Sequence, residues 1–273
     1  MRSELALARF GFALVTLSLG VPAGAHDLWL VADSPSVAEG APLRLKAATG
    51  MQFPESLSAV APDRVDAFWV VDAAGERHEV TGARADGKLL RADVQLDAPG
   101  VALAALAIKP RTLELAAAEF NEYLEHDGLP QVLEHRRARG ELEIDARESY
   151  AKYAKAIVTV GEDGSRDLAT RPAGLRIEIV PLRDPGGVGA GEELPVQVLF
   201  EGRPLEGVYV YALAPGADAY VDGHRTNEDG RAAVQLPSGG LMSLHCIHMR
   251  PHADPELADW ESFFATVSFV AAE

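Results

Sequence analysis

Residues 175–182 read LRIEIVPL, and this stretch decides the fold class. Leu175, Ile177 and Ile179 alternate with Arg176 and Glu178, which is the two-residue period of a half-buried β-strand. Gly, Pro and Asp turns separate it from further stretches of the same kind. These are LPVQVLF (194–200), GVYVYALA (207–214), GRAAVQLP (230–237) and GLMSLHCIHM (240–249). Short strands at this spacing predict a sandwich or barrel rather than an α/β fold.

The turns of this C-terminal half follow a recognisable order. FEGRPLEGVYVYA (200–212) places a turn before a strand, TNEDGRAAVQLP (226–237) does so again, and SGGLMSLHCIH (238–248) follows. This succession resembles the small seven-stranded sandwiches of the transthyretin or carboxypeptidase-regulatory type. The resemblance implies a binding or spacer module without a catalytic centre of its own.

The N-terminal half also reads as short strands, with one helical interruption. Strands are expected in HDLWLVA (26–32), VDAFWVV (65–71) and VALAALAI (101–108), whereas apolar residues recur at helical spacing near 116–139. The polar segment EDGSRDLATRPAG (162–174) predicts a linker. We therefore expect a mostly β protein with two immunoglobulin- or transthyretin-like sandwich units. These span 26–161, with the helical insertion in the first unit, and 175–273.

The first 25 residues have the order of a secretory signal. Arg2 and Arg9 precede an apolar run over 10–21, and Ala23-Gly24-Ala25 follows. This order predicts cleavage after Ala25 and export to the periplasm. A run of this length is too short for the roughly 20 residues of a membrane span, and no later stretch comes closer, so we expect no span.

Charge, cysteine content and missing motifs limit the classes of partner and function that we expect. The chain carries 25 Lys and Arg against 41 Asp and Glu, a net charge of −16, so nucleic acid is an unfavourable partner. Cys246 is the single cysteine, which excludes an intramolecular disulfide. The G-x-S-x-G, H-E-x-x-H, phosphate-loop and paired Cys-x-x-Cys patterns of common enzymes are missing from the sequence. We therefore interpret the chain as a non-enzyme.

Cleavage after Ala25 would make His26 the first residue. Its α-amine and imidazole would then form a bidentate nitrogen chelator, because the α-amine has an ordinary pKa of only about 7.7 to 8.0. Such nitrogens suit nickel, cobalt, copper or zinc. The alternative is that His26 lies in solvent at the start of a first strand in which Trp29 packs.

A second histidine group lies near the C-terminus. His245 and His248 would point to opposite faces of one strand, so they cannot share a site there. Pro251 predicts the end of that strand, and this favours His248, His252 and Asp254 as a ligand trio. The alternative for each histidine is a packed, hydrogen-bonded role in the core, which is favoured for His245.

Several phrases, taken in order, resemble one known family. They are AHDLWL (25–30), FNEYLEHDGL (120–129), RESYAKYAKAIVTVG (147–161), RTNEDGRAAVQLPSGG (225–240), IHM (247–249) and DWESFFATVSF (259–269). This family of unknown function is described as the periplasmic component of cobalt/nickel ABC-type transport. The resemblance covers nearly the whole chain after residue 25. It implies a secreted β-sandwich protein with His26, His248, Trp260 and Glu261 in matching positions.

Three functional hypotheses follow. The first is a periplasmic metal-binding accessory protein that handles nickel or cobalt, with the metal ion and a membrane transporter complex as partners. The second is a non-catalytic envelope binding or structural module without metal. The third is a copper carrier or copper enzyme that uses an N-terminal histidine. In the first hypothesis the ligands are His26, His248, His252 and Asp254, and the first and last strands would contribute to one site.

Overall fold

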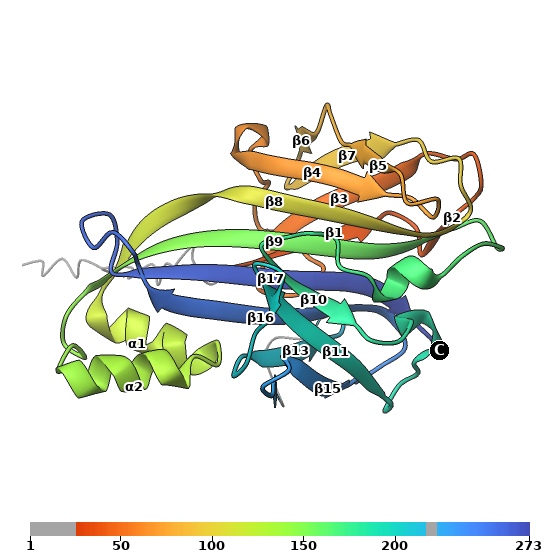
Figure 1. Cartoon of the computed structure of the whole chain (residues 1–273). Helices are drawn as coiled ribbons and strands as arrows, with labels where there is room; N and C mark the ends of the chain where they lie inside the picture. The colour runs from red at the N-terminus through yellow and green to blue at the C-terminus, as the bar shows by residue number, and fades with distance from the viewer. Residues whose placement is uncertain (1–25, 217–222) are drawn as a thin grey trace, which may run out of the picture.

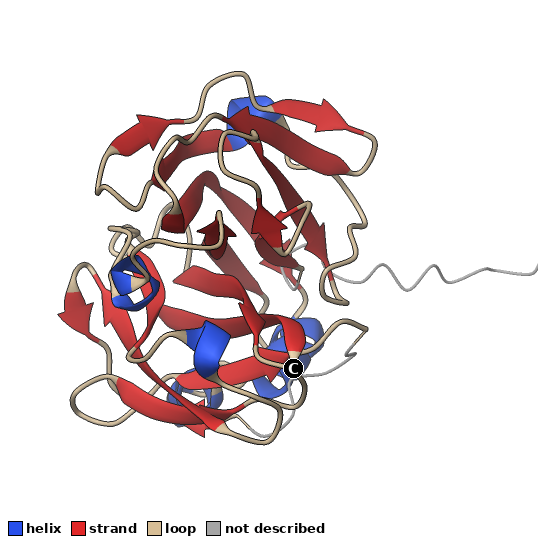
Figure 2. Ribbon diagram, turned by 90° about the vertical axis from the view of Figure 1, so that its right-hand side faces the viewer, coloured by secondary structure: helices blue, strands red, loops and turns tan. Residues whose placement is uncertain are grey.

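The computed structural model describes residues 26–216 and 223–273. The expected signal peptide lies outside these residues. Strands are the main secondary structure of the described chain and far outnumber helices (Figure 2), which confirms the predicted mostly β class. No helix among the described residues is long and apolar enough to cross a membrane.

One nine-stranded sheet forms the centre of the molecule, with the order β14-β13-β16-β17-β9-β8-β4-β5 and with β2 paired to β9. Its strands are β2 (Ser36–Val37), β4 (Val65–Val71), β5 (Arg77–Glu79), β8 (Gly100–Leu115), β9 (Ala146–Val160), β13 (Tyr209–Leu213), β14 (His224–Arg225), β16 (Gly240–Pro251) and β17 (Trp260–Ala271). Most neighbours in this sheet are antiparallel, but β9 and β17 run parallel. The long strands β8, β9, β16 and β17 lie side by side through the middle of the molecule (Figure 1).

Two four-stranded sheets complete the fold. The first has the order β1-β3-β7-β6, and in the second β11 pairs with β10, β12 and β15. The first comprises β1 (Asp27–Ala32), β3 (Leu43–Gly50), β6 (Arg84–Asp86) and β7 (Leu89–Val94). The second comprises β10 (Ile177–Pro181), β11 (Glu193–Phe200), β12 (Arg203–Pro204) and β15 (Arg231–Gln235). Short 3-10 turns are η1 (Pro62–Arg64), η2 (Asp167–Thr170) and η3 (Pro185–Gly187).

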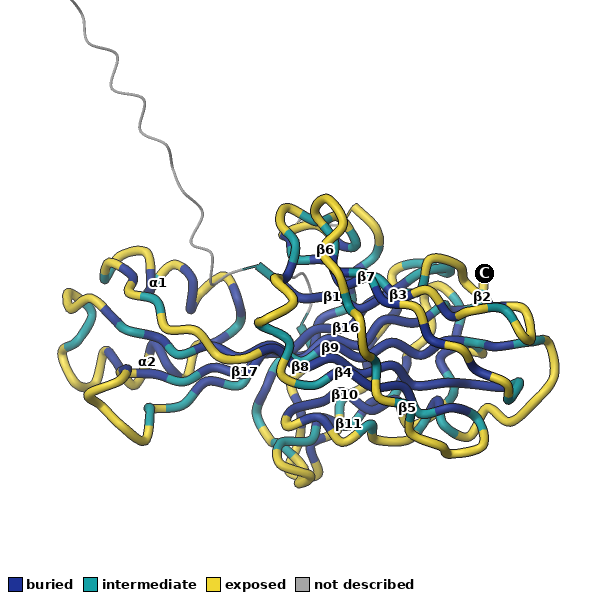
Figure 3. The backbone as a smooth tube through the Cα atoms, turned by 90° about the horizontal axis from the view of Figure 1, so that it is seen from above, coloured by how far each residue is buried: buried dark blue, intermediate teal, exposed yellow. Residues whose placement is uncertain are grey.

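The small sheets pack on opposite faces of the central sheet. On β8, Val101 and Leu103 belong to the core beneath the second small sheet, whereas Ala102 and Ala104 belong to the core beneath the first. Because adjacent residues of a strand point to opposite faces, β8 contributes to both cores. Figure 3 shows the buried strands running between these layers. The apolar character of β8 on both faces follows from this position.

The expected division into two separate sandwich units is not confirmed. The parallel pair of β9 and β17 joins the two halves of the chain into one sheet. The segment expected as a linker, 162–174, is held to that sheet, because Ser165 bridges to Gly100 and Ala169 is fully buried. Such long-range strand pairing has no signature in local periodicity.

Two helices lie in the range predicted for the insertion, α1 (Ala117–His126) and α2 (Pro130–Arg139). Gly128, with a φ of 71°, turns the chain between them, and Gly140, with a φ of 72°, ends α2. The helices cover the far ends of β8, β9, β16 and β17 (Figure 1), where Phe120 and Leu124 pack on Trp260 and Phe264.

Candidate functional site

His26 lies immediately before β1 and lines a pocket beside the central sheet. Its backbone oxygen accepts a hydrogen bond from Nζ of Lys152, which lies on β9. The imidazole is half-buried, and burial, followed by the charge of Lys152, lowers its pKa. A neutral imidazole near pH 7 is the form that can donate a nitrogen lone pair to a metal ion.

Behind His26 lies a group of five ionisable side chains in the protein interior, here named the buried polar cluster. Each of its members is at most 3% exposed. The members come from β1, the end of α1, β9 and β16, and they are Asp27, Asp127, Glu148, Lys152 and His245.

Two close contacts involve members of the cluster, the first within it and the second at its edge. Nδ1 of His245 lies 2.8 Å from Oδ1 of Asp27. Nδ1 of His126, an exposed residue at the end of α1, lies 2.7 Å from Oδ1 of Asp127. The second pair extends from the cluster to the surface.

Burial dominates the ionisation of the cluster. It raises the pKa of Glu148 to about 7 against the opposing hydrogen bonds from Ser262 and Tyr123. It raises the pKa of Asp127 as well, and it lowers the pKa of Lys152 to about 8. All three shifts disfavour the charged form, as expected when an ionisable group leaves water.

The cluster also contains carboxylate oxygens without a hydrogen-bond partner among the described residues. They are Oδ2 of Asp127 and Oε2 of Glu148. Buried polar atoms are nearly always hydrogen-bonded, so atoms left in this state mark a place where a ligand or ion can bind.

The structure places the sequence-predicted ligands apart. In the register of β16, β17 and β9, His248 pairs with Phe263, and Phe263 pairs with Ala151. One position away, Ile247 pairs with Phe264, and Phe264 pairs with Lys152. Neighbouring residues point to opposite faces, so His248 and Lys152 lie on opposite faces of the central sheet. Because Lys152 contacts His26, the two histidines His26 and His248 are also on opposite sides. β1 does lie against β17, but the two imidazoles do not meet.

His248 packs between aromatic rings, with ring centroids 4.8 Å from Phe200 and 6.1 Å from Phe263. Burial, followed by the charge of Arg250, lowers its pKa to about 4. His252 and Asp254 lie beyond β16, where Nδ1 of His252 accepts a hydrogen bond from the backbone N–H of Asp254. The role of His248, His252 and Asp254 as ligands stays a prediction, and the structure gives them no common centre.

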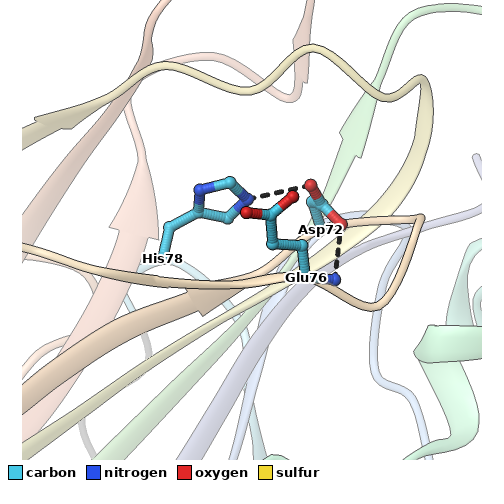
Figure 4. A group of neighbouring side chains, drawn as sticks. All are labelled: Asp72, Glu76 and His78. Carbon is cyan, nitrogen blue, oxygen red and sulfur yellow. Dashed lines mark hydrogen bonds and ion pairs between the residues drawn. The ribbon is translucent and has the colours of Figure 1, made fainter.

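One compact donor group exists elsewhere. Within residues 26–216 and 223–273, Asp72, Glu76 and His78 form the only set of three or more His, Cys, Asp or Glu side chains whose ligand atoms lie within 4.8 Å of one another (Figure 4). Asp72 already has a structural role, because its Oδ1 accepts hydrogen bonds from the backbone N–H groups of Ala74 and Glu76. Its Oδ2 contacts Nε2 of His78 at 2.8 Å. This group therefore also serves as the turn of the β4–β5 hairpin.

Sequence reasoning missed most of the buried polar cluster. Asp27 and Asp127 each directly follow a histidine, in AHDLWL and LEHDGL, and Glu148 opens RESYAKYAKAIVTVG after one residue. These phrases are among those that resemble the family, so the sequence did mark the positions of the three acidic residues. Periodicity could not single the acids out, because their proximity depends on strands far apart in the chain.

Comparisons with solved structures give only remote likenesses. The Escherichia coli adhesin FdeC is 13% identical with a TM-score of 0.25, covering 92% of this chain and 65% of that one. The D0-D1 domain of intimin is 11% identical with a TM-score of 0.21, covering 90% and 98%. A Salmonella alpha-2-macroglobulin mutant is 13% identical with a TM-score of 0.26, covering 97% and 16%. Scores this low do not establish a shared fold.

No curated protein matches the sequence. One family model does, over residues 23–250, and this stretch contains His26 and every member of the buried polar cluster. The chain therefore belongs to the family described as a domain of unknown function, DUF4198.

Proposed function

We propose that this chain is a non-catalytic accessory protein of the bacterial periplasm that binds a divalent transition-metal ion at His26. The ion is nickel or cobalt, and the protein delivers it to a membrane transporter. The proposal requires cleavage after Ala25, which frees the α-amine of His26.

The observation that carries the proposal is the position of His26 against the buried polar cluster. The imidazole supplies one nitrogen, and the freed amine would supply a second in the same chelate ring. The charge of Asp27, the next residue, acts on the imidazole of His26, and the other carboxyl groups of the buried polar cluster lie near Lys152. In a poorly hydrated interior this charge attracts a cation more strongly than it would in water.

The choice of metal follows from the donors. Imidazole and amine nitrogens with nearby carboxylates suit the borderline divalent ions of the first transition row. Affinity alone would favour copper, so selection of nickel or cobalt would depend on the geometry and on the ions available in the periplasm. The resemblance to a family linked with cobalt and nickel transport supports this choice.

The test compares two forms of the protein. One begins at His26, and the other retains Ala25, which converts the amine into an amide. We expect calorimetric titration with Ni²⁺ and Co²⁺ to show roughly a tenfold to hundredfold weaker binding in the longer form, equal to about 1.4 to 2.7 kcal/mol. Equal affinities would remove the terminal chelate and with it the proposal.

The group of Asp72, Glu76 and His78 supplies the matched control. His78→Ala removes the imidazole of that group but leaves His26 intact. We expect this variant to bind Ni²⁺ as the unsubstituted protein does. If His78→Ala abolished binding and retention of Ala25 did not, the metal site would lie on the β4–β5 hairpin instead.

A further inference from the structure

The pocket beside His26 has an unusual charge for this protein. It has a volume of about 160 Å³, below the roughly 300–1,000 Å³ of pockets for drug-sized ligands, so its guest is small. The side chains around it are His26, Thr49, Ser58, Ala59, Val60, Ala61, Arg64, Ile108, Arg111, Tyr150 and Lys152. Three of them are cationic and none is acidic, although the chain as a whole carries a net charge of −16.

An irregularity in β8 places one of these cations. Register aligns Ile108 with Lys152 and Arg111 with Tyr150, so two residues of β8, Lys109 and Pro110, stand opposite one residue of β9. This bulge returns Arg111 to the face that carries Ile108, although a spacing of three would otherwise put them on opposite faces. Pro110 fits such a site, because proline cannot donate a hydrogen bond to a neighbouring strand.

The other two cations lie deeper. Lys152 is 3% exposed, and its Nζ lies 5.1 Å from the ring centroid of Tyr150. The guanidinium of Arg64 lies 5.9 Å from the same ring, and its Nη2 donates to the backbone oxygen of Lys109. Arg111 forms neither a hydrogen bond nor an ion pair with any described residue. Repulsion by Arg111 contributes to the lowered pKa of Arg64, after the larger effect of burial.

This arrangement opposes a bare divalent cation on the pocket side of His26. A dication approaching through the pocket would meet three like charges, two of them partly or fully removed from water. An anion would instead offset their mutual repulsion. Carboxylates match arginine best, because the planar guanidinium donates two parallel hydrogen bonds to one carboxylate.

We propose that the His26 pocket binds the carboxylate groups of a small organic chelator, so that the metal ion reaches His26 as an anionic hydroxycarboxylate or aminocarboxylate complex. This inference rests on the proposed function, in which His26 is a ligand of the ion. His26 supplies at most two donors, and the chelator supplies the remaining ones. Arg64, Arg111 and Lys152 recognise the charge of the complex rather than the ion itself.

The experiment uses the chain that begins at His26 and titrates it calorimetrically with three probes. These are citrate alone, Ni²⁺ alone, and a one-to-one mixture of Ni²⁺ and citrate. Arg111→Gln is the main variant, because Arg111 is exposed and its loss removes no hydrogen bond or ion pair among the described residues. Arg64→Gln is the second variant. Arg44→Gln is the matched control, since Arg44 is exposed on β3 and does not line the pocket.

We expect the Ni²⁺–citrate mixture to bind more tightly than either component. Arg111→Gln and Arg64→Gln should each weaken citrate and Ni²⁺–citrate binding by roughly tenfold or more, as expected for the loss of one charged hydrogen bond. Neither change should weaken the binding of Ni²⁺ alone, and Arg44→Gln should change nothing. Thermal unfolding of each variant verifies that it is folded.

Two failures would differ in their meaning. If Ni²⁺ alone bound as tightly as its citrate complex, or if both arginine variants bound citrate normally, the chelator pocket would be wrong while the metal function stood. If citrate bound and neither Ni²⁺ nor its complex did, the metal function would be wrong, and the pocket would be an anion site without a metal.

Discussion

Asp27 and His245 lie near opposite ends of the described chain and meet in its interior, with Oδ1 of the first 2.8 Å from Nδ1 of the second. Their side chains are 1% and 0% exposed. The contact joins the start of β1 to β16 and holds the residue after His26 in place. The position of the candidate ligand His26 therefore depends on a pair of residues that local sequence does not connect.

This pair should be strongly coupled in folding. Removing one partner leaves an ionisable group buried without its counterpart, which typically costs about 3–5 kcal/mol. We therefore expect Asp27→Asn and His245→Gln each to lower the free energy of unfolding in urea by an amount of that order. The double variant should lose much less than the sum.

The exposed pair of Arg84 and Asp93, with a contact of 3.2 Å, is the control for this cycle. Exposed ion pairs contribute about 0–1 kcal/mol, so the same double-mutant cycle there should give little coupling. Additive losses for Asp27 and His245 would show that the two side chains are stabilised independently of each other.

Glu148 predicts a dependence of stability on pH. Its pKa is about 7 in the folded protein and near its ordinary value of 4.5 in the unfolded chain. Between these values the folded state holds the proton and the unfolded state releases it, so stability falls as the pH rises. The contribution is complete below about pH 4.5 and is lost above about pH 7. It amounts to at most about 3 kcal/mol.

We expect Glu148→Gln to remove this slope. Urea unfolding measured from pH 4.5 to 8 should show that the variant loses less stability with rising pH than the unsubstituted protein does. Glu143→Gln is the control, because Glu143 is exposed in the segment after α2. Parallel curves for Glu148→Gln and the unsubstituted protein would contradict the assignment.

The strands could be predicted from the sequence because their alternation is local. Phe263, Ala265, Val267 and Phe269 share one buried face, as the two-residue period requires. The helical insertion was visible for the same reason. The parallel pairing of β9 with β17 was not, because it joins segments separated by more than a hundred residues.

The candidate site likewise has one part that local sequence predicts and another that depends on long-range strand pairing. His26 could be selected from its place after the signal-like segment, because the chemistry of a terminal histidine is local. Its neighbour Lys152 and the buried polar cluster around Lys152 could not, because strands far apart in the chain bring them together. His245 was expected to be a packed and hydrogen-bonded histidine, and its complete burial against Asp27 agrees with the packing part of that expectation.

His248 predicts stability loss in acid. Its pKa is about 4 in the folded protein against an ordinary value of 6.5. Below pH 6.5 the unfolded chain gains a proton that the folded protein does not, so stability falls as the pH decreases towards 4. We expect His248→Gln to reduce this loss by up to about 3 kcal/mol between pH 7 and 4.

The affinity for Ni²⁺ provides a second measurement on the His248→Gln variant. Because His248 lies on the face of the sheet opposite to His26, His248→Gln should leave the affinity of the chain for Ni²⁺ unchanged. His252→Gln is the control for both measurements, since His252 lies beyond the end of β16. A loss of Ni²⁺ affinity in His248→Gln alone would restore His248 as a ligand.

The packing of α1 on the central sheet predicts a contrast between two glycines. Gly128 and Gly140 follow α1 and α2 with φ values of 71° and 72°, so alanine is equally strained in the backbone at both positions. A Cβ atom at Gly140 would meet nothing within 4 Å, whereas one at Gly128 would lie 2.0 Å from the hydroxyl oxygen of Tyr211. Tyr211 is only 7% exposed, so its side chain has little room to shift, and we expect α1 or β13 to move instead.

We therefore expect Gly128→Ala to lower the free energy of unfolding by about 1–3 kcal/mol more than Gly140→Ala, which is the usual cost of overpacking. The shift also displaces Asp127, the residue before Gly128, from His245 and Glu148. Gly128→Ala should for this reason weaken Ni²⁺ binding, and Gly140→Ala should not. Equal unfolding curves for the two variants would show that Tyr211 does not hold the end of α1 against the buried polar cluster.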